Sequence, residues 1–202
     1  MRTVIFDLGE TLVDETRLWA MVARLTGVPS FTLSAMIGAA ILGKFDPYVP
    51  LGVQRVTATE HGFSLQLSDF YADAIPTLQR LQELGYPLGI VANQPQGIAE
   101  NLAAMDLPLD VLATSATYGV AKPDPAFFHS IVADCGVPAD QIVYVGDRID
   151  NDILPARSIG MQAVFIRRGP WGFIQASWPE ARQIRHQIDT LTELPTLLAT
   201  MP

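Results

Sequence analysis

The chain has 202 residues, of which 49% are hydrophobic and 17% are charged, and its formal net charge at pH 7 is -8. This length and composition are typical of one globular domain, or of one domain with a small insertion, and exclude a disordered chain. The negative charge argues against a broad basic surface for nucleic acid, and an anionic substrate would need local cations.

The cysteine content and the apolar segments bear on location. The single cysteine, Cys135, excludes an intramolecular disulfide and fits a reducing cytoplasm. The N-terminal stretch MRTVIFDLGE becomes acidic too early for a signal peptide. The most apolar stretch, FTLSAMIGAAILGKF (31–45), is shorter than the roughly 20 residues that cross a bilayer, so we expect a buried or half-buried helix and no membrane partner.

Short apolar runs alternate with longer helical patterns along the chain. Five runs rich in Val and Ile are predicted strands: TVIF (3–6), PLGIVA (87–92), DVLAT (110–114), QIVYVG (141–146) and QAVFIR (162–167). Between them lie helical patterns such as AIPTLQRLQELG (74–85), where Ile75, Leu78 and Leu81 form the apolar face, Leu84 is a further candidate for it, and Gly85 ends the helix. Apolar strands separated by helices predict a three-layer, doubly wound, mostly parallel α/β sheet of Rossmann type.

A long segment separates the first two predicted strands. Some eighty residues lie between Phe6 and Ile90, whereas a crossover with its helix needs only about a dozen. We therefore predict an α/β core domain formed by residues 1–14 and 73–202, and an inserted helical cap over residues 15–72. Ligands of such sheets bind outside the carboxyl ends of the strands, where the strand order reverses, so the cap is expected to cover that edge.

Polar residues follow the predicted strands at that edge: Asp7, Asn93, Lys122 in AKPDP, and the carboxylates Asp147, Asp150 and Asp152 in GDRIDND. Asp7 can be a nucleophile for a phosphoryl group, or a turn residue that caps the next segment. Lys122 can neutralise a carboxylate and a phosphate together, or be a solvated surface lysine. The clustered carboxylates can hold Mg2+, or form a solvated acidic turn.

These motifs, in this order and at these strand ends, resemble those of the haloacid dehalogenase-like (HAD) superfamily. The resemblance covers nearly the whole chain and includes DAIPTLQRLQELGYPLGIVANQ, GVAKPDPAFF and IVYVGDRIDNDILPARSIGM. The segment between the first two motifs is similar to the helical (type C1) cap of that superfamily. The resemblance implies a Mg2+-dependent phosphatase of a small phosphorylated metabolite, with Asp7 as nucleophile and an aspartyl-phosphate intermediate.

The resemblance also implies roles for the other motif residues. Lys122 would orient both Asp7 and the transferred phosphoryl group. The metal would be held by Asp7, the backbone carbonyl of Gly9, Asp147 and Asp152, the last of these directly or through water. The phosphate would be bound by the backbone N–H of Ala92, by Asn93 and by Lys122.

Two positions depart from the family pattern. Phosphatases of the family have a second Asp where this chain has Gly9, and losing that general acid and base costs about 10^2 to 10^4 in rate if nothing replaces it. Glu10 is the candidate to replace it, or else a solvated turn carboxylate, because adjacent residues leaving a strand point in different directions. Ala92 stands where the family has Ser or Thr, so a hydrogen bond to phosphate worth about 1.5 to 3 kcal/mol would be lost.

Three functions remain open on these residues. The first is a phosphatase that prefers good leaving groups, such as acyl or aryl phosphates, because their leaving oxygen needs little protonation. The second is an impaired pseudo-enzyme that binds Mg2+ and a phosphate ligand or a protein partner without turnover. The third is a dehalogenase-like hydrolase that uses Asp7 without a metal, which the carboxylates around Asp147 disfavour. Trp19, in the predicted cap, is a candidate for the substrate pocket or for a core.

Overall fold

The computed structural model describes residues 2–46 and 58–201, so part of the predicted cap, residues 47–57, lies outside the described residues. Its strands form one parallel sheet in the order β3-β2-β1-β4-β5-β6. They are β1 (Thr3–Phe6), β2 (Leu88–Ala92), β3 (Val111–Thr114), β4 (Ile142–Gly146), β5 (Gln162–Ile166) and β6 (Gln187–Ile188). The five predicted strands are confirmed to within one residue at each end. The sixth strand was not predicted, because two residues are too few to show a periodic pattern.

Strand β1 lies at the centre of the sheet, between β2 and β4. Its last residue, Phe6, is in register with Ile90 of β2 and with Val145 of β4. The strand order reverses here, because β2 and β3 lie on one side of β1, whereas β4, β5 and β6 lie on the other side. The residues that follow β1, β2 and β4 therefore meet at one point of the carboxyl edge.

The α-helices are α1 (Thr16–Thr26), α2 (Ser30–Gly43), α3 (Ala74–Glu83), α4 (Gln96–Ala103), α5 (Ser115–Tyr118), α6 (Pro125–Cys135), α7 (Leu154–Ser158), α8 (Gly169–Gln175) and α9 (Leu194–Thr200). Short 3-10 turns are η1 (Ala58–His61), η2 (Leu67–Asp69), η3 (Ala139–Gln141), η5 (Pro179–Gln183) and η6 (Leu191–Glu193). The segment η4 (Ile149–Ile153) is a π-helix that leads directly into α7.

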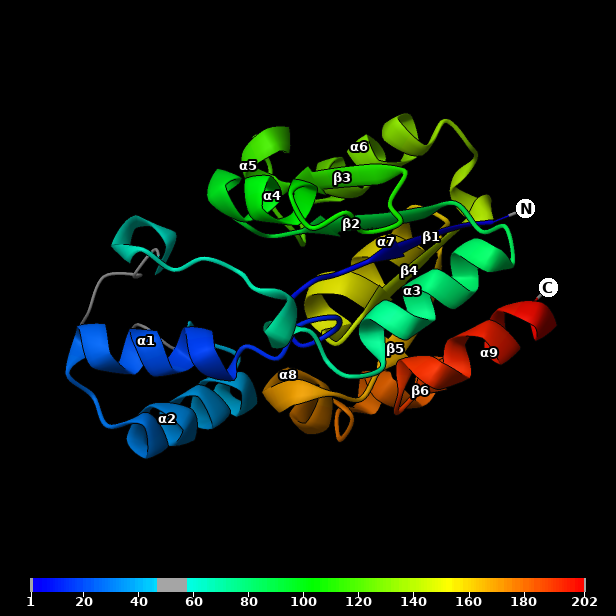
Figure 1. The fold of residues 1–202 in the computed structure, drawn as a ribbon. Coiled ribbons are helices and arrows are strands. Elements are labelled where there is room, and N and C mark those ends of the chain that lie inside the picture. Colours follow the sequence, from blue (N-terminus) through cyan, green and yellow to red (C-terminus); the bar gives the residue numbers. More distant parts are fainter. Residues whose placement is uncertain (1, 47–57, 202) are drawn as a thin grey trace.

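Helices cover both faces of the sheet (Figure 1). Side chains alternate along β1, so Val4 and Phe6 pack on the face covered by α3, α4 and α9, whereas Ile5 packs on the face covered by α6 and α7. The strands are buried on both faces, as a parallel sheet requires. The predicted three-layer, doubly wound α/β fold is confirmed.

Helix α3 shows how the predicted apolar face meets this core. Leu78 and Leu81 are fully buried, and Ile75 packs against the same cluster while partly exposed. Leu84, however, is 39% exposed, so its place on the buried face was predicted wrongly. The helix has ended at that point, and Gly85 follows with a φ of 85° that favours glycine.

Helices α1 and α2 stand beside the carboxyl edge of the sheet, apart from its covering layers (Figure 1). They share a small apolar cluster formed by Val22, Ala23, Leu33, Ile37 and Ile41. The half-buried helix predicted for the apolar stretch is confirmed in α2, because its inner side chains are buried while Phe31 is 88% exposed. Among the described residues no single helix meets the length and apolarity of a membrane span; α1 and α2 do so only as a pair bent by 107°.

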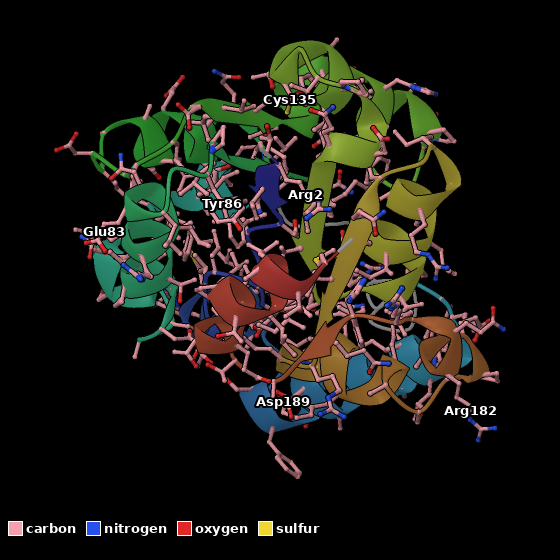
Figure 2. All side chains as sticks on the ribbon, turned by 90° about the vertical axis from the view of Figure 1, so that its right-hand side faces the viewer. Arg2, Glu83, Tyr86, Cys135, Arg182 and Asp189 are labelled. Atoms are coloured by element: carbon pink, nitrogen blue, oxygen red, sulfur yellow. The ribbon has the colours of Figure 1, made fainter. Side chains whose placement is uncertain are left out.

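The charged side chains of Glu83 and Arg182 are exposed and point outward at opposite edges of the molecule (Figure 2). Cys135, the last residue of α6, is only partly exposed. Burial, assisted by the charge of Asp134, raises the pKa of the Cys135 thiol to about 11, so the thiol is protonated at neutral pH.

Candidate active site

The ammonium group of Lys122 connects the ends of three strands. Its Nζ donates hydrogen bonds to Asp7 Oδ1 at 2.7 Å, to Asp152 Oδ1 at 2.5 Å and to the Tyr144 hydroxyl at 3.0 Å. Burial alone would lower the pKa of Lys122, but the carboxylates of Asp152 and Asp7 outweigh it and hold that pKa well above its usual value. With a side chain only 1% exposed, Lys122 is a buried cation and not a solvated surface lysine.

The turn that carries Lys122 is held by Asn93. The Asn93 Nδ2 group donates to the Lys122 carbonyl at 2.9 Å, and the Lys122 N–H donates to Asn93 Oδ1 at 2.8 Å. On the other side of the turn, Asp124 caps α6 by accepting a hydrogen bond from the Ala126 N–H at 2.8 Å. Both polar atoms of the Asn93 side chain are therefore engaged in positioning the lysine.

Three carboxylates gather beside this lysine. Asp7, Asp147 and Asp152 each offer an oxygen atom within 4.8 Å of the other two. Burial, together with the charges of Asp152 and Asp7, raises the pKa of Asp147 well above its usual value. Asp147 Oδ2 is buried without a hydrogen-bond partner among the described residues. A hard divalent cation would give this oxygen a partner and would relieve the repulsion, so the donor set fits a metal.

The π-helix η4 sets the position of Asp152. Its Oδ2 accepts a hydrogen bond from the Arg148 N–H at 3.0 Å, and its Oδ1 binds Lys122. A Cβ atom at Gly146 would lie 2.5 Å from Asp152 Oδ2, so the absence of a side chain at Gly146 makes room for this carboxylate. Asp150 also lines the cavity described below but lies outside the triad, and it is paired with Arg148, with 3.1 Å between Oδ2 and Nη2.

The loop after β1 brings Glu15 back to the site. A Cβ atom built on Gly9 would lie 2.3 Å from Oε1 of Glu15, so the Glu15 carboxyl occupies the space that a side chain at position 9 would enter. Its other oxygen, Oε2, accepts a hydrogen bond from the Trp19 indole at 3.1 Å. Burial, with the negative charges of Glu10 and Asp7, raises the pKa of Glu15 to about 8.

Glu10 is buried and lies in the left-handed backbone region, with a φ of 53°. Its Oε1 accepts from the Glu15 N–H at 3.1 Å, and its Oε2 accepts from the Tyr71 hydroxyl at 2.5 Å. Burial raises the pKa of Glu10, against the opposing effect of the Tyr71 hydrogen bond. Glu10 is thus not a solvated turn carboxylate, and it holds the start of α1.

A cavity of about 920 Å3 lies between this edge of the sheet and the helices α1 and α2. Asp7, Gly9, Glu15, Lys122 and Asp147 line its polar end. Its apolar wall includes Leu18, Trp19, Val22, Ile41, Phe45, Phe63 and Trp171. Trp19 also packs on Trp171, with 6.1 Å between ring centroids, so it belongs both to the cavity wall and to the small apolar cluster of α1 and α2.

Sequence reasoning missed three residues of this site. Tyr144 carried a signal, because a tyrosine inside a buried strand needs a partner for its hydroxyl, and here it donates to the Val91 carbonyl at 2.8 Å. Gly146 and Glu15 carried no such signal. The role of Gly146 depends on where the Asp152 carboxylate lies, and that of Glu15 on the space beside Gly9. Ala92, predicted to bind phosphate through its N–H, ends β2 and packs into the core face of the sheet.

The fold and the site together define a Rossmann-type α/β protein in which an aspartate, a lysine and further carboxylates meet where the strand order reverses. The model of the haloacid dehalogenase-like hydrolase family matches residues 1–160, and the chain belongs to that family.

Relatives include a glyceraldehyde 3-phosphate phosphatase of Methanocaldococcus jannaschii, 33% identical over 138 residues that make up 65% of this chain and 58% of that protein. A phosphoglycolate phosphatase of Xanthomonas campestris is 32% identical, with 98% of this chain and 94% of that protein covered. The chain thus spans little more than half the length of the first relative and nearly all of the second.

Solved structures give the same fold for two chemistries. A HAD phosphatase from Thermococcus onnurineus is 26% identical, with a TM-score of 0.65 and 98% of each chain covered. A 2-haloacid dehalogenase from Pseudomonas syringae pv. tomato is 25% identical, with a TM-score of 0.64 and the same coverage. The choice between a phosphorylated and a halogenated substrate therefore depends on the site residues and not on the fold.

Proposed function

We propose that this protein is a Mg2+-dependent phosphatase that hydrolyses a small phosphorylated metabolite, with the phosphoryl group carried transiently on Asp7. The observation that supports it most is Asp147 Oδ2, which is buried within the carboxylate triad beside Lys122 and has no hydrogen-bond partner in the part of the chain that the structure describes. A cation at such a site would stabilise the charge of a transferring phosphoryl group, whereas attack of a carboxylate on a carbon-halogen bond has no need of it. The names of the two phosphatase relatives support the same substrate class.

Asp7 lies at the polar end of the cavity, and its Oδ1 accepts a hydrogen bond from Lys122 Nζ. Lys122 holds that carboxylate in place and balances its charge, and its predicted contact with the transferred phosphoryl group is part of the proposal. The metal would be held by Asp7, the Gly9 carbonyl, Asp147 and Asp152. When bound, it would stabilise the negative charge of the phosphoryl group.

The remaining assignments belong to the same proposal. The N–H of Ala92 and the side chain of Asn93 are assigned to phosphate binding, with Asn93 also positioning Lys122 as described above. Residues 15–72 are assigned to a cap, which the cavity between the sheet edge, α1 and α2 supports. A cytoplasmic location and the absence of nucleic-acid and membrane partners remain predictions from the sequence.

The test is release of inorganic phosphate from glyceraldehyde 3-phosphate, phosphoglycolate and 4-nitrophenyl phosphate, with Mg2+ and with a chelator. We expect turnover that needs Mg2+ and falls to background in Asp7→Asn. Asp150→Asn is the matched control, because Asp150 is paired with Arg148 outside the triad, and it should stay within about threefold of wild type.

Three outcomes would contradict the proposal. Absence of turnover in the wild type would favour the pseudo-enzyme, and undiminished turnover in Asp7→Asn would show that Asp7 is not the nucleophile. Metal-independent halide release from a 2-haloacid would favour dehalogenase-like chemistry.

A further inference from the structure

We propose that Glu15 is the proton-transfer residue of this site and replaces the side chain that position 9 lacks. The inference rests on the proposed function, because it assigns a further catalytic residue to the same reaction. It starts from one geometric fact: the Glu15 carboxyl stands 2.3 Å, measured from Oε1, from where the Cβ atom of a residue at position 9 would be.

That placement puts a carboxyl in the same cavity as the nucleophile. Gly9 follows Asp7 by two residues, and Asp7, Gly9 and Glu15 all line the same cavity. A side chain at position 9 would enter this cavity from the strand end, whereas Glu15 reaches the same space from the residue before α1. The two routes exclude each other, since the Glu15 carboxyl and a Cβ atom at position 9 cannot occupy the same space.

The Glu15 carboxyl is held in this place from two directions. Trp19, one helical turn later, donates its indole N–H to Oε2 at 3.1 Å, and the ring of Trp19 packs on Trp171. The backbone N–H of Glu15 donates to Glu10 Oε1 at 3.1 Å. The anchoring of Oε2 leaves Oε1 directed toward Gly9 and the polar end of the cavity.

Glu10, the candidate from the sequence, has a different position. Both of its oxygen atoms accept hydrogen bonds, from Tyr71 and from Glu15, and its side chain fills the space beside Gly169. Glu10 therefore acts through Glu15, as a positioning residue, and the proton-transfer role belongs to Glu15.

The two half-reactions balance with Glu15 in this role. In the first, an Asp7 oxygen forms a bond to phosphorus, the bond from phosphorus to the leaving oxygen breaks, and that oxygen takes the proton of the Glu15 carboxyl. In the second, the Glu15 carboxylate takes a proton from water, the water oxygen attacks phosphorus, and the bond to Asp7 breaks. Phosphate leaves, Asp7 is again a carboxylate and Glu15 is again protonated.

The leaving group is the probe for the first half-reaction. An alkyl phosphate, phosphoglycolate, needs protonation of its leaving oxygen, whereas an aryl phosphate, 4-nitrophenyl phosphate, needs little. We expect Glu15→Gln to lower kcat/KM for the alkyl phosphate by about 10^2 to 10^4. For the aryl phosphate kcat/KM should fall by less than about tenfold, because this parameter covers only the steps through leaving-group departure.

Glu10→Gln is the matched control, since it changes a neighbouring buried carboxyl by the same one atom. It should lower kcat/KM for phosphoglycolate by a much smaller factor than Glu15→Gln does, because glutamine at position 10 keeps an oxygen that can accept the Glu15 N–H. Glutamine at position 15 keeps an oxygen that can accept the Trp19 hydrogen bond, so folding is expected to be preserved; near-ultraviolet circular dichroism checks this.

A rescue experiment tests the geometry directly. In Gly9→Asp alone the new side chain would clash with the Glu15 carboxyl, so we expect no increase in the rate of phosphoglycolate hydrolysis. With Glu15→Ala the space opens, and the double variant Gly9→Asp/Glu15→Ala should hydrolyse phosphoglycolate at least about tenfold faster than Glu15→Ala.

The failures are distinguishable. If no wild-type turnover depends on Asp7, the proposed function and this inference both fall. If turnover depends on Asp7 but Glu15→Gln keeps the wild-type ratio of alkyl to aryl rates, only the role of Glu15 is overturned.

Discussion

The buried carboxyl groups at the two ends of the loop after β1 have different kinds of hydrogen-bond donor. We call the first group the lysine side, formed by Asp7, Lys122, Tyr144 and Asp152, and the second the glutamate side, formed by Glu10, Glu15, Trp19 and Tyr71. On the lysine side an ammonium binds two carboxylates. On the glutamate side an indole, a phenol and a backbone N–H donate hydrogen bonds to the carboxyls.

The difference is one of chemistry as well as of position. A buried ammonium favours the charged form of a carboxylate, which suits metal ligands; at Asp152 this opposes burial, which raises the pKa of that carboxyl to about 6. Neutral donors leave a carboxyl able to exist with or without its proton, which suits proton transfer. The lysine side is built on strand ends, whereas the glutamate side joins the loop after β1 to α1, so each side can be perturbed by itself.

The largest expected effect is on the lysine side, in Lys122→Met. The change leaves the buried carboxylates of Asp7 and Asp152 without their cation, so we expect about 3 to 5 kcal/mol less free energy of unfolding at neutral pH. Urea denaturation measures it. The control is Lys44→Met, a lysine whose side chain is 60% exposed, which should lose about 0.5 kcal/mol or less. Equal losses in the two variants would mean that Lys122 does not balance the site.

A smaller effect is expected on the same side in Tyr144→Phe. The change deprives the buried Val91 carbonyl of its donor and Lys122 of an acceptor, which should cost about 1 to 3 kcal/mol in the free energy of unfolding. Tyr118→Phe is the control, because its hydroxyl binds the exposed Asp134 at 2.6 Å and its loss should cost less. If both variants lost the same small amount of free energy of unfolding, the hydrogen bonds of the Tyr144 hydroxyl would contribute less to stability than the structure indicates.

The matching change on the glutamate side is Tyr71→Phe. It removes the hydroxyl that binds Glu10 Oε2, and we expect about 0.5 to 1.5 kcal/mol less free energy of unfolding. The loss should be below that of Tyr144→Phe, because no lysine ammonium depends on this hydroxyl. Because Glu10 holds the Glu15 N–H, kcat/KM should fall more for phosphoglycolate than for 4-nitrophenyl phosphate. If the ratio of these two kcat/KM values stayed unchanged, Tyr71 would have no part in proton transfer.

An effect of similar size is expected at the attachment of α1, which begins next to Glu15. Arg17 on α1 donates two hydrogen bonds to the buried Asp69, at 2.7 and 2.5 Å, and they help to hold the pKa of Asp69 below its usual value. Asp69→Asn should cost about 1 kcal/mol at neutral pH. The unfolded pKa of an aspartate is about 3.9, so this difference is present above that pH and is lost as pH falls through the lower folded pKa. Urea unfolding at pH 7 and pH 3 measures it; a constant difference would contradict the ion pair.

The lysine side was largely predictable from the sequence and the glutamate side was not. Asp7, Lys122, Asp147 and Asp152 follow predicted strands, and the ends of parallel strands converge, so a one-dimensional pattern sufficed to bring them together. The position of Glu15 depends instead on the loop folding back, through the left-handed backbone of Glu10 and the bridge between Gly9 and Val13. The periodicity of apolar residues along the sequence does not predict such a loop conformation.

The most direct test of the account is the covalent state of Glu15→Gln during reaction with 4-nitrophenyl phosphate and Mg2+. If Asp7 is the nucleophile and Glu15 the base for water, the first half-reaction proceeds and the second stalls. Acid quench and intact-mass measurement should then show the protein heavier by one phosphoryl group, on the peptide that contains Asp7, after a burst of one 4-nitrophenolate per site. Protein that stays unmodified, or that carries the phosphoryl group on another peptide, would contradict the account.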